Sequence, residues 1–257
     1  MKNLNNKLVF ITGASSGIGK ACAISFAKKG ANILICARRI ERLKDLSEFL
    51  KKKYKVNVHY FQLDVRKYSD VKKKINSLPA KWKKIDILVN NAGLSRGLNK
   101  IQDGVLLDWE EMIDTNIKGL LYVTKEVISL LMKQQTGHII NIGSIAGHEV
   151  YPGGNAYCAS KHAVDALTNG FRMDLIDTNI RVSTIDPGLV RTEFSIVRYR
   201  GDKIKAETAY KGMTPLKPED IADAVIYAAT RNDNVVIAEM IIVPKAQASS
   251  TLVKRNL

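Results

Sequence analysis

The hydrophobic residues of this chain fall into short continuous runs that alternate with longer stretches in which apolar residues recur at helical spacing. Short runs rich in Val and Ile are typical of strands buried on both faces. The runs predict strands at 7–12, 31–37, 57–65, 85–93, 137–144, 180–188 and 239–244. The amphipathic stretches predict helices at 17–29, 39–53, 67–77, 108–133, 156–177 and 218–231.

Strands that alternate with helices indicate a parallel sheet covered on both faces. We therefore predict an α/β fold: one Rossmann-type, doubly wound domain with a seven-stranded parallel sheet, spanning residues 1–257. The 189–217 segment follows the sixth strand at the carboxyl edge of the sheet, where such folds bind ligands, and is predicted to be a substrate lid. Residues 245–257 have no helical period, and we expect a C-terminal arm that packs on another subunit.

Composition excludes several classes of protein. Apolar residues make up 46% of the chain, no apolar run is long enough to cross a bilayer, and no secretory signal is visible. The three cysteines have no paired or metal-like spacing, so we expect a cytoplasmic protein with no metal site. The net charge is +15, but the lysines cluster on helical stretches without interleaved aromatic residues. We expect a solvated surface and neither a nucleic-acid nor a membrane partner.

The glycine-rich stretch TGASSGIG (12–19) joins the first strand to the first helix. Gly13 permits the tight turn, Gly17 lets the backbone approach a pyrophosphate, and Gly19 lets the helix pack closely on the strand. A turn without a ligand is the alternative, but the strand-to-helix context favours a dinucleotide loop. The expected cofactor contacts in this loop are Gly13, Ser15, Ser16, Gly17, Ile18 and Gly19.

The end of the second strand reads Cys36-Ala37-Arg38-Arg39 and has no carboxylate to hold the ribose 2′-hydroxyl of NAD. Two arginines there suit a 2′-phosphate, so we predict NADP(H). Arg38 is the stronger candidate, Ser15 can add a hydroxyl, and one of the two arginines alternatively begins an exposed helix.

Tyr157 and Lys161 in NAYCASKHAVDA (155–166) lie four residues apart, on one face of the predicted helix. A free phenol has a pKa of about 10. A nearby ammonium favours the phenolate, which would bring Tyr157 toward the range useful for acid–base catalysis. Ser144, at the end of the fifth strand, can hydrogen-bond a substrate oxygen. The pattern predicts proton transfer on a carbonyl/alcohol pair while a nicotinamide carries the hydride.

The TGASSGIG loop, Asn90-Asn91-Ala92-Gly93, Asn116, Ser144, Tyr157-x-x-x-Lys161 and Pro187-Gly188 together resemble the short-chain dehydrogenase/reductase family, over nearly the whole chain. The resemblance implies a catalytic set of Asn116, Ser144, Tyr157 and Lys161. In that set Asn116 holds a water that connects Lys161 to solvent, and Lys161 contacts the nicotinamide ribose. The further cofactor contacts implied are Asp64, Val65, Asn91, Ala92, Gly93, Tyr157, Lys161, Pro187, Gly188, Val190 and Thr192.

The stretches 77–94, 112–120, 137–147 and 187–202 are similar to NADP-dependent 3-hydroxy acid dehydrogenases. This implies a homotetramer that oxidises serine, allo-threonine or 3-hydroxypropionate-like acids. A buried carboxylate needs a cationic partner, for which Arg198 is favoured and Arg191 comes second. The predicted substrate contacts are Ser144, Arg198, Arg191 and Tyr151, with His148 also expected at the pocket wall.

Three other functions are compatible with the sequence. The first is a reductase of another carbonyl, such as a 3-oxoacyl thioester or a diketone. The second is a protein that binds NADP(H) without chemistry, against which the intact Tyr157 and Lys161 pair argues. The third is a nucleic-acid binder that uses the lysine-rich face, whose binding would fall steeply with salt.

Overall fold

The computed structural model describes residues 3–256 and contains a seven-stranded sheet in the order β3-β2-β1-β4-β5-β6-β7. Every neighbouring pair of strands is parallel. The strands are β1 (Leu8–Thr12), β2 (Asn32–Ala37), β3 (Val58–Gln62), β4 (Ile87–Asn90), β5 (Gly137–Ile142), β6 (Ile180–Pro187) and β7 (Glu239–Ile242). The predicted parallel sheet is confirmed, and each strand lies within the range that its hydrophobic run predicts.

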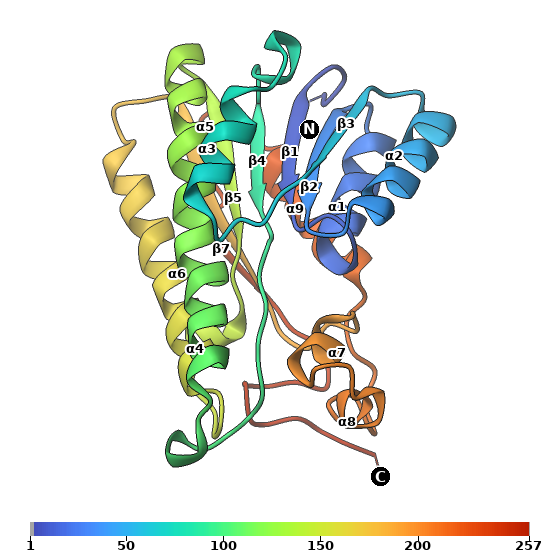
Figure 1. Ribbon diagram of the computed structural model, residues 1–257, viewed down its shortest axis with the longest axis vertical. Coiled ribbons are helices and arrows are strands. Elements are labelled where there is room, and N and C mark those ends of the chain that lie inside the picture. The colour runs from blue at the N-terminus through green and yellow to red at the C-terminus, as the bar shows by residue number, and fades with distance from the viewer. Residues whose placement is uncertain (1–2, 257) are drawn as a thin grey trace.

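Helices cover both faces of the sheet, as Figure 1 shows. On one face, apolar residues of α1 (Gly17–Lys28), α2 (Ile40–Tyr54) and α9 (Pro218–Ala229) form one core cluster with alternate strand residues. On the other face, α3 (Tyr68–Asn76), α5 (Leu120–Gln134) and the end of α6 (Asn155–Asp174) form a second cluster with the strand residues between them. This alternation explains why the strands are apolar at nearly every position.

The helix predicted at 108–133 is interrupted. It consists of α4 (Leu106–Ile113), a π-helical segment η3 (Asp114–Gly119) and α5. Such π segments are frequent at functional sites, and this one contains Asn116. The hydrophobic period of the sequence does not reveal it, because a single wider turn changes the spacing of the apolar residues by only one position.

The 189–217 segment contains two short helices, α7 (Phe194–Arg198) and α8 (Lys203–Thr208). The C-terminal residues lie against this segment of the same chain: the side-chain oxygen of Gln247 accepts a 2.8 Å hydrogen bond from the Leu189 amide, and the Asn256 amide donates to the Gly212 carbonyl over 2.8 Å. The expected C-terminal arm, residues 245–257, therefore packs at Gln247 and Asn256 on the 189–217 segment of its own chain. Among residues 3–256, no helix has the length and apolar character to cross a membrane.

Candidate functional site

A cavity of about 430 Å³ lies at the carboxyl edge of the sheet, below the ends of β1, β4, β5 and β6. The strand order reverses at β1, because β2 and β3 lie on one side of it and β4 to β7 lie on the other. Open α/β sheets bind ligands in the crevice at such a point. The predicted site residues that line the cavity are Gly13, Ser15, Ser16, Gly17, Ile18, Arg38, Arg39, Asp64, Val65, Asn91, Ala92, Gly93, Ser144, Tyr151, Tyr157, Lys161, Pro187, Gly188, Val190, Thr192 and Arg198. Gly19, Asn116 and Arg191 do not line it.

The glycine-rich loop needs its glycines for conformation and for space. Gly17 begins α1 with φ +54°, in the left-handed region that favours glycine. A Cβ on Gly19 would lie 2.7 Å from the Gly13 carbonyl oxygen, closer than real Cβ contacts. Gly19 therefore allows α1 to begin directly at the loop, so that Gly17 and Ile18 at the start of the helix line the cavity.

The two arginines after β2 have different surroundings. Arg39 donates to the hydroxyls of Ser15, over 3.0 Å, and Ser16, over 2.7 Å, and forms an ion pair with Glu193 at 2.7 Å. The guanidinium of Arg38 has no hydrogen bond or ion pair to any of residues 3–256. Both side chains line the cavity, so Arg38 is the one whose guanidinium remains available to an anion. Ser15, predicted to assist Arg38, instead binds Arg39.

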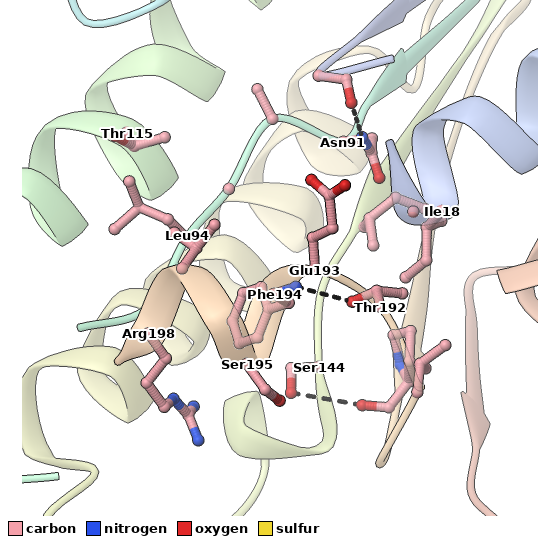
Figure 2. A pocket seen from close by; sticks show the side chains of 18 of the residues that line it. Ile18, Asn91, Leu94, Thr115, Ser144, Thr192, Glu193, Phe194, Ser195 and Arg198 are labelled. Atoms are coloured by element: carbon pink, nitrogen blue, oxygen red, sulfur yellow. Dashed lines mark hydrogen bonds between the residues drawn. The ribbon is translucent and has the colours of Figure 1, made fainter. Parts of the chain in front are cut away.

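The end of β4 is tied to the end of β1. The Thr12 hydroxyl accepts hydrogen bonds from the amides of Asn91 and Ala92, each over 3.0 Å, and the Asn91 side chain donates to the Thr12 carbonyl over 2.9 Å. Figure 2 shows Asn91 and Ile18 at one side of the view, Thr192, Glu193 and Phe194 of the 189–217 segment near its centre, and Arg198 of the same segment at the opposite side. The cavity thus lies between the strand ends and that segment.

Tyr157 is 8% exposed, and its ring meets the Phe194 ring edge-on at 5.7 Å. Burial raises the pKa of the Tyr157 phenol, while the Arg198 guanidinium and a hydrogen bond from Ser144 oppose that rise. The sequence led us to expect that Lys161 lowers this pKa. That expectation was wrong for the protein alone, because desolvation is the larger effect and Arg198 is the cation that acts on the phenol.

Lys161 is buried, and its ammonium donates a 2.9 Å hydrogen bond to the Ile142 carbonyl. Burial lowers the pKa of Lys161 to about 8, and the carboxylate of Asp186 acts in the opposite direction. An ammonium with this pKa keeps most of its charge near neutral pH and remains available to a second acceptor.

Asn116 binds the backbone beside the cavity. Its side-chain oxygen accepts from the Leu94 amide over 2.9 Å, and its amide group donates to the Leu94 carbonyl over 2.9 Å and the Ser160 hydroxyl over 3.0 Å. A Cβ on Gly93 would lie 3.3 Å from that oxygen and 3.8 Å from Nζ of Lys161, so the two side chains flank Gly93. Asn116 therefore positions the segment after β4 next to Lys161.

The backbone of Ser144 is hydrogen-bonded to the carboxylate of Asp186. The Ser144 amide donates to Oδ1 of Asp186 over 3.1 Å, and the Ser144 hydroxyl accepts from the Ala146 amide over 3.1 Å. The same hydroxyl lies 3.4 Å from the Pro187 carbonyl (Figure 2). These contacts fix Ser144 at the end of β5, where its hydroxyl lines the cavity.

Arg198 is the cation that α7 brings to the cavity. Its guanidinium donates to the hydroxyls of Ser95 and Tyr151, each over 3.0 Å. It also lies over the rings of Tyr157 and Phe194, 5.3 and 5.4 Å from their centres. Sequence reasoning missed Ser95 and Phe194, because no local pattern marks either of them.

Two other predicted pocket residues lie elsewhere. The Arg191 side chain is 51% exposed, pairs with Glu207 at 2.9 Å and stacks on the ring of Tyr210. It does not reach the cavity, which removes the geometric support for Arg191 as a substrate contact. His148 likewise faces away from the cavity, toward Asp186 and Glu239.

Known proteins resemble the chain over its full length. The short chain dehydrogenase family model matches residues 7–202. An NADP-dependent 3-hydroxy acid dehydrogenase of Schizosaccharomyces pombe is 43% identical over 257 residues, covering 100% of this chain and 99% of the relative. A sulfoacetaldehyde reductase 2 of Chromohalobacter salexigens is 42% identical and covers 95% and 96%.

Among solved structures, the closed form of a serine dehydrogenase complexed with NADP+ superimposes with a TM-score of 0.90 at 41% identity, covering 97% of this chain and 100% of that one. The matched sequence, the shared fold and the cavity at the strand ends lead to the same conclusion. The chain belongs to the short-chain dehydrogenase family.

Proposed function

We propose that this protein is an NADP-dependent oxidoreductase that interconverts a 3-hydroxy acid, such as serine, allo-threonine or a 3-hydroxypropionate-like acid, and its 3-oxo acid. The observation that carries the proposal is the Arg198 guanidinium, which lies 5.3 Å from the centre of the Tyr157 ring inside the cavity. A cation at that distance from the acid–base group matches a substrate whose carboxylate lies about two carbons from the reacting alcohol. Relatives named for NADP-dependent 3-hydroxy acid and serine dehydrogenation support it.

The residues around the cavity fit NADP(H). The start of α1 presents backbone amides to the cavity at Gly17, as a pyrophosphate requires. Arg38 offers an available guanidinium where a ribose 2′-phosphate would lie. The carboxylate of Asp64, by contrast, is held by Arg66 through a 2.6 Å ion pair. In this part of the site the adenine would therefore contact Val65 or the backbone of Asp64. When bound, the nicotinamide supplies the hydride donor or acceptor.

The chain's own residues would move the proton. In the oxidising direction, the Tyr157 phenolate takes the proton of the substrate hydroxyl, while Ser144 orients that oxygen by a hydrogen bond. Arg198 binds the carboxylate and, through its charge, favours the phenolate. Lys161 keeps an ammonium at the base of the site for the ribose hydroxyls, and Asn116 fixes the neighbouring backbone.

The 189–217 segment is proposed to act as the substrate lid of a single catalytic domain. Glu193 at the start of α7 pairs with Arg39 and with Arg42, each at 2.7 Å, and so links this segment to the cofactor loop.

We further propose a cytoplasmic homotetramer. Exposed apolar side chains offer surfaces for subunit contacts, and light scattering of the purified protein measures the assembly. Those side chains are Leu106, Leu107, Met173 and Ile176.

A second candidate is the reduction of a small aldehyde that carries a sulfonate. A relative of almost equal identity is named a sulfoacetaldehyde reductase. A guanidinium binds a sulfonate with the same paired N–H groups that it offers a carboxylate, so Arg198 fits either anion. A 3-oxoacyl thioester or a diketone has no anionic group beside the carbonyl and would leave the part-buried Arg198 guanidinium without an anionic partner.

Replacing Arg38 with Asp is expected to weaken NADP+ binding by about ten- to a hundredfold, the loss of a hydrogen bond to a charged group, while NAD+ binding stays unchanged or improves. Fluorescence titration with NADPH and NADH measures both affinities. Arg42→Asp is the matched control, because Arg42 pairs with Glu193 but does not line the cavity. Unchanged NADPH affinity in Arg38→Asp would refute the role of Arg38.

Replacing Arg198 with Ala is expected to raise KM for a 3-hydroxy acid by about ten- to a hundredfold, because a charge-assisted hydrogen bond to the carboxylate is lost. For an alcohol without a carboxylate, the same variant should change KM by less than about threefold. Arg191→Ala is the control and should leave both values near those of the wild type. Equal losses for both substrates would show that Arg198 acts by holding the fold of the lid.

Initial rates with NADP+ and NAD+ should separate the candidate substrates. The panel is L-serine, D-serine, L-allo-threonine, 3-hydroxypropionate, 3-hydroxybutyrate, 2-hydroxyethanesulfonate and a carboxylate-free alcohol. We expect turnover with NADP+ and the hydroxy acids. Preference for the sulfonate would favour the second candidate, and activity confined to the plain alcohol or to added thioesters and ketones would reject the hydroxy-acid assignment while keeping the acid–base chemistry.

A further inference from the structure

Three potential metal ligands meet behind Ser144, on the side away from the cavity. His148 follows the short helix η4 (Ile145–Gly147), Asp186 lies in β6, and Glu239 begins β7. Nε2 of His148 is 3.4 Å from Oδ2 of Asp186 and 3.4 Å from Oε1 of Glu239. The three donor atoms all lie within 4.8 Å of one another. None of the three residues lines the cavity, so the cluster is separate from the proposed active site.

Two buried polar atoms at the centre of this cluster have no hydrogen bond. Asp186 is 2% exposed, and its Oδ1 is occupied by the Ser144 amide and the Thr184 hydroxyl. Its Oδ2 and Nε2 of His148 form no hydrogen bond with any residue in the described range 3–256. Buried polar atoms nearly always have a partner. Nε2 of His148 approaches the two carboxylates only at 3.4 Å, and an imidazole nitrogen between two carboxylates is chemically matched to a cation.

The two distances from Nε2 of His148, each 3.4 Å, fit a shared metal ion better than hydrogen bonds from a protonated imidazole. Nitrogen and oxygen ligands about 2.1 Å from Zn²⁺ at tetrahedral angles lie about 3.4 Å from each other. A charge-assisted hydrogen bond from His148 to either carboxylate would instead measure about 2.7–2.9 Å. The imidazole favours a first-row transition metal over Mg²⁺ or Ca²⁺, and the two carboxylates supply balancing negative charge.

We propose that His148, Asp186 and Glu239 bind a divalent transition-metal ion of the Zn²⁺ type, with water completing its shell. Solvent reaches the site past Glu239, whose side chain is 39% exposed. The ion is structural: it holds the Asp186 carboxylate that binds the Ser144 amide, and it joins the edge strand β7 to the loop after β5. The sequence predicted no metal site, because these residues lie far apart in the chain and match no ligand spacing.

Calorimetric titration of the full-length protein with Zn²⁺, after removal of metals with a chelator, tests the proposal. We expect one ion per chain, and a Kd at least about tenfold weaker in Glu239→Gln and in His148→Gln, since losing even a residue that supports a ligand costs that much. Glu219→Gln and His162→Gln are matched controls outside the cluster and should bind as the wild type does. Bound Zn²⁺ should also raise the melting temperature of the wild type more than that of Glu239→Gln at the same Zn²⁺ concentration.

Two results would overturn the proposal. The first is that the wild type binds no Zn²⁺ and melts at the same temperature with and without it. The second is that Glu239→Gln and His148→Gln both bind Zn²⁺ as tightly as the wild type, which would place any bound ion elsewhere. Glu239 lies at the partly exposed edge strand and Gln matches its size, so this variant is expected to fold, as its circular dichroism will verify.

Discussion

The contacts of Arg198 connect the two walls of the pocket. Its guanidinium comes from α7, donates to Ser95 and Tyr151 on the opposite wall, and lies over the Tyr157 ring. The position of the 189–217 segment and the pKa of the Tyr157 phenol therefore depend on the same cation. If a substrate carboxylate binds Arg198, it also screens the charge that favours the phenolate. Substrate binding and proton transfer are thus electrostatically coupled.

Sheet topology explains why the chemical groups lie together. All strands are parallel, so the loop after β1, the arginines after β2, Asn91 after β4, Ser144 after β5 and the 189–217 segment after β6 leave the sheet at one edge. The buried polar groups at that edge are stabilised by one another: Thr12 binds the backbone after β4, and Asp186 binds the backbone of Ser144. Such paired contacts hold an active site in place before any ligand binds.

Local patterns in the sequence predicted much of the fold, the glycine-rich loop and the Tyr157 and Lys161 pair, whereas the further cofactor contacts were implied only by the resemblance to a known family. Apolar runs marked the strands, and the residues directly after each strand had to lie at the carboxyl edge. What the sequence could not separate was Arg191 from Arg198. The two lie on one short segment, and the fold of α7 directs Arg198 toward Tyr157 while Arg191 turns outward to Glu207.

The features that escaped prediction depend on contacts between distant parts of the chain. The His148, Asp186 and Glu239 cluster exists because β6 pairs with both β5 and β7. The burial that raises the pKa of Tyr157 comes partly from Phe194, which belongs to a later segment. The π turn around Asn116 changes the spacing of the apolar residues by only one position, which is too small a change to mark it in the sequence.

The central claim is that Tyr157 transfers the proton and that cofactor binding does not depend on the Tyr157 hydroxyl. The most direct test replaces Tyr157 with Phe and measures both the turnover of a 3-hydroxy acid with NADP+ and the affinity for NADPH. The account predicts that turnover falls at least about a hundredfold, the usual contribution of a positioned acid–base group, while the NADPH affinity stays within about threefold. Turnover within about tenfold of the wild type would contradict it.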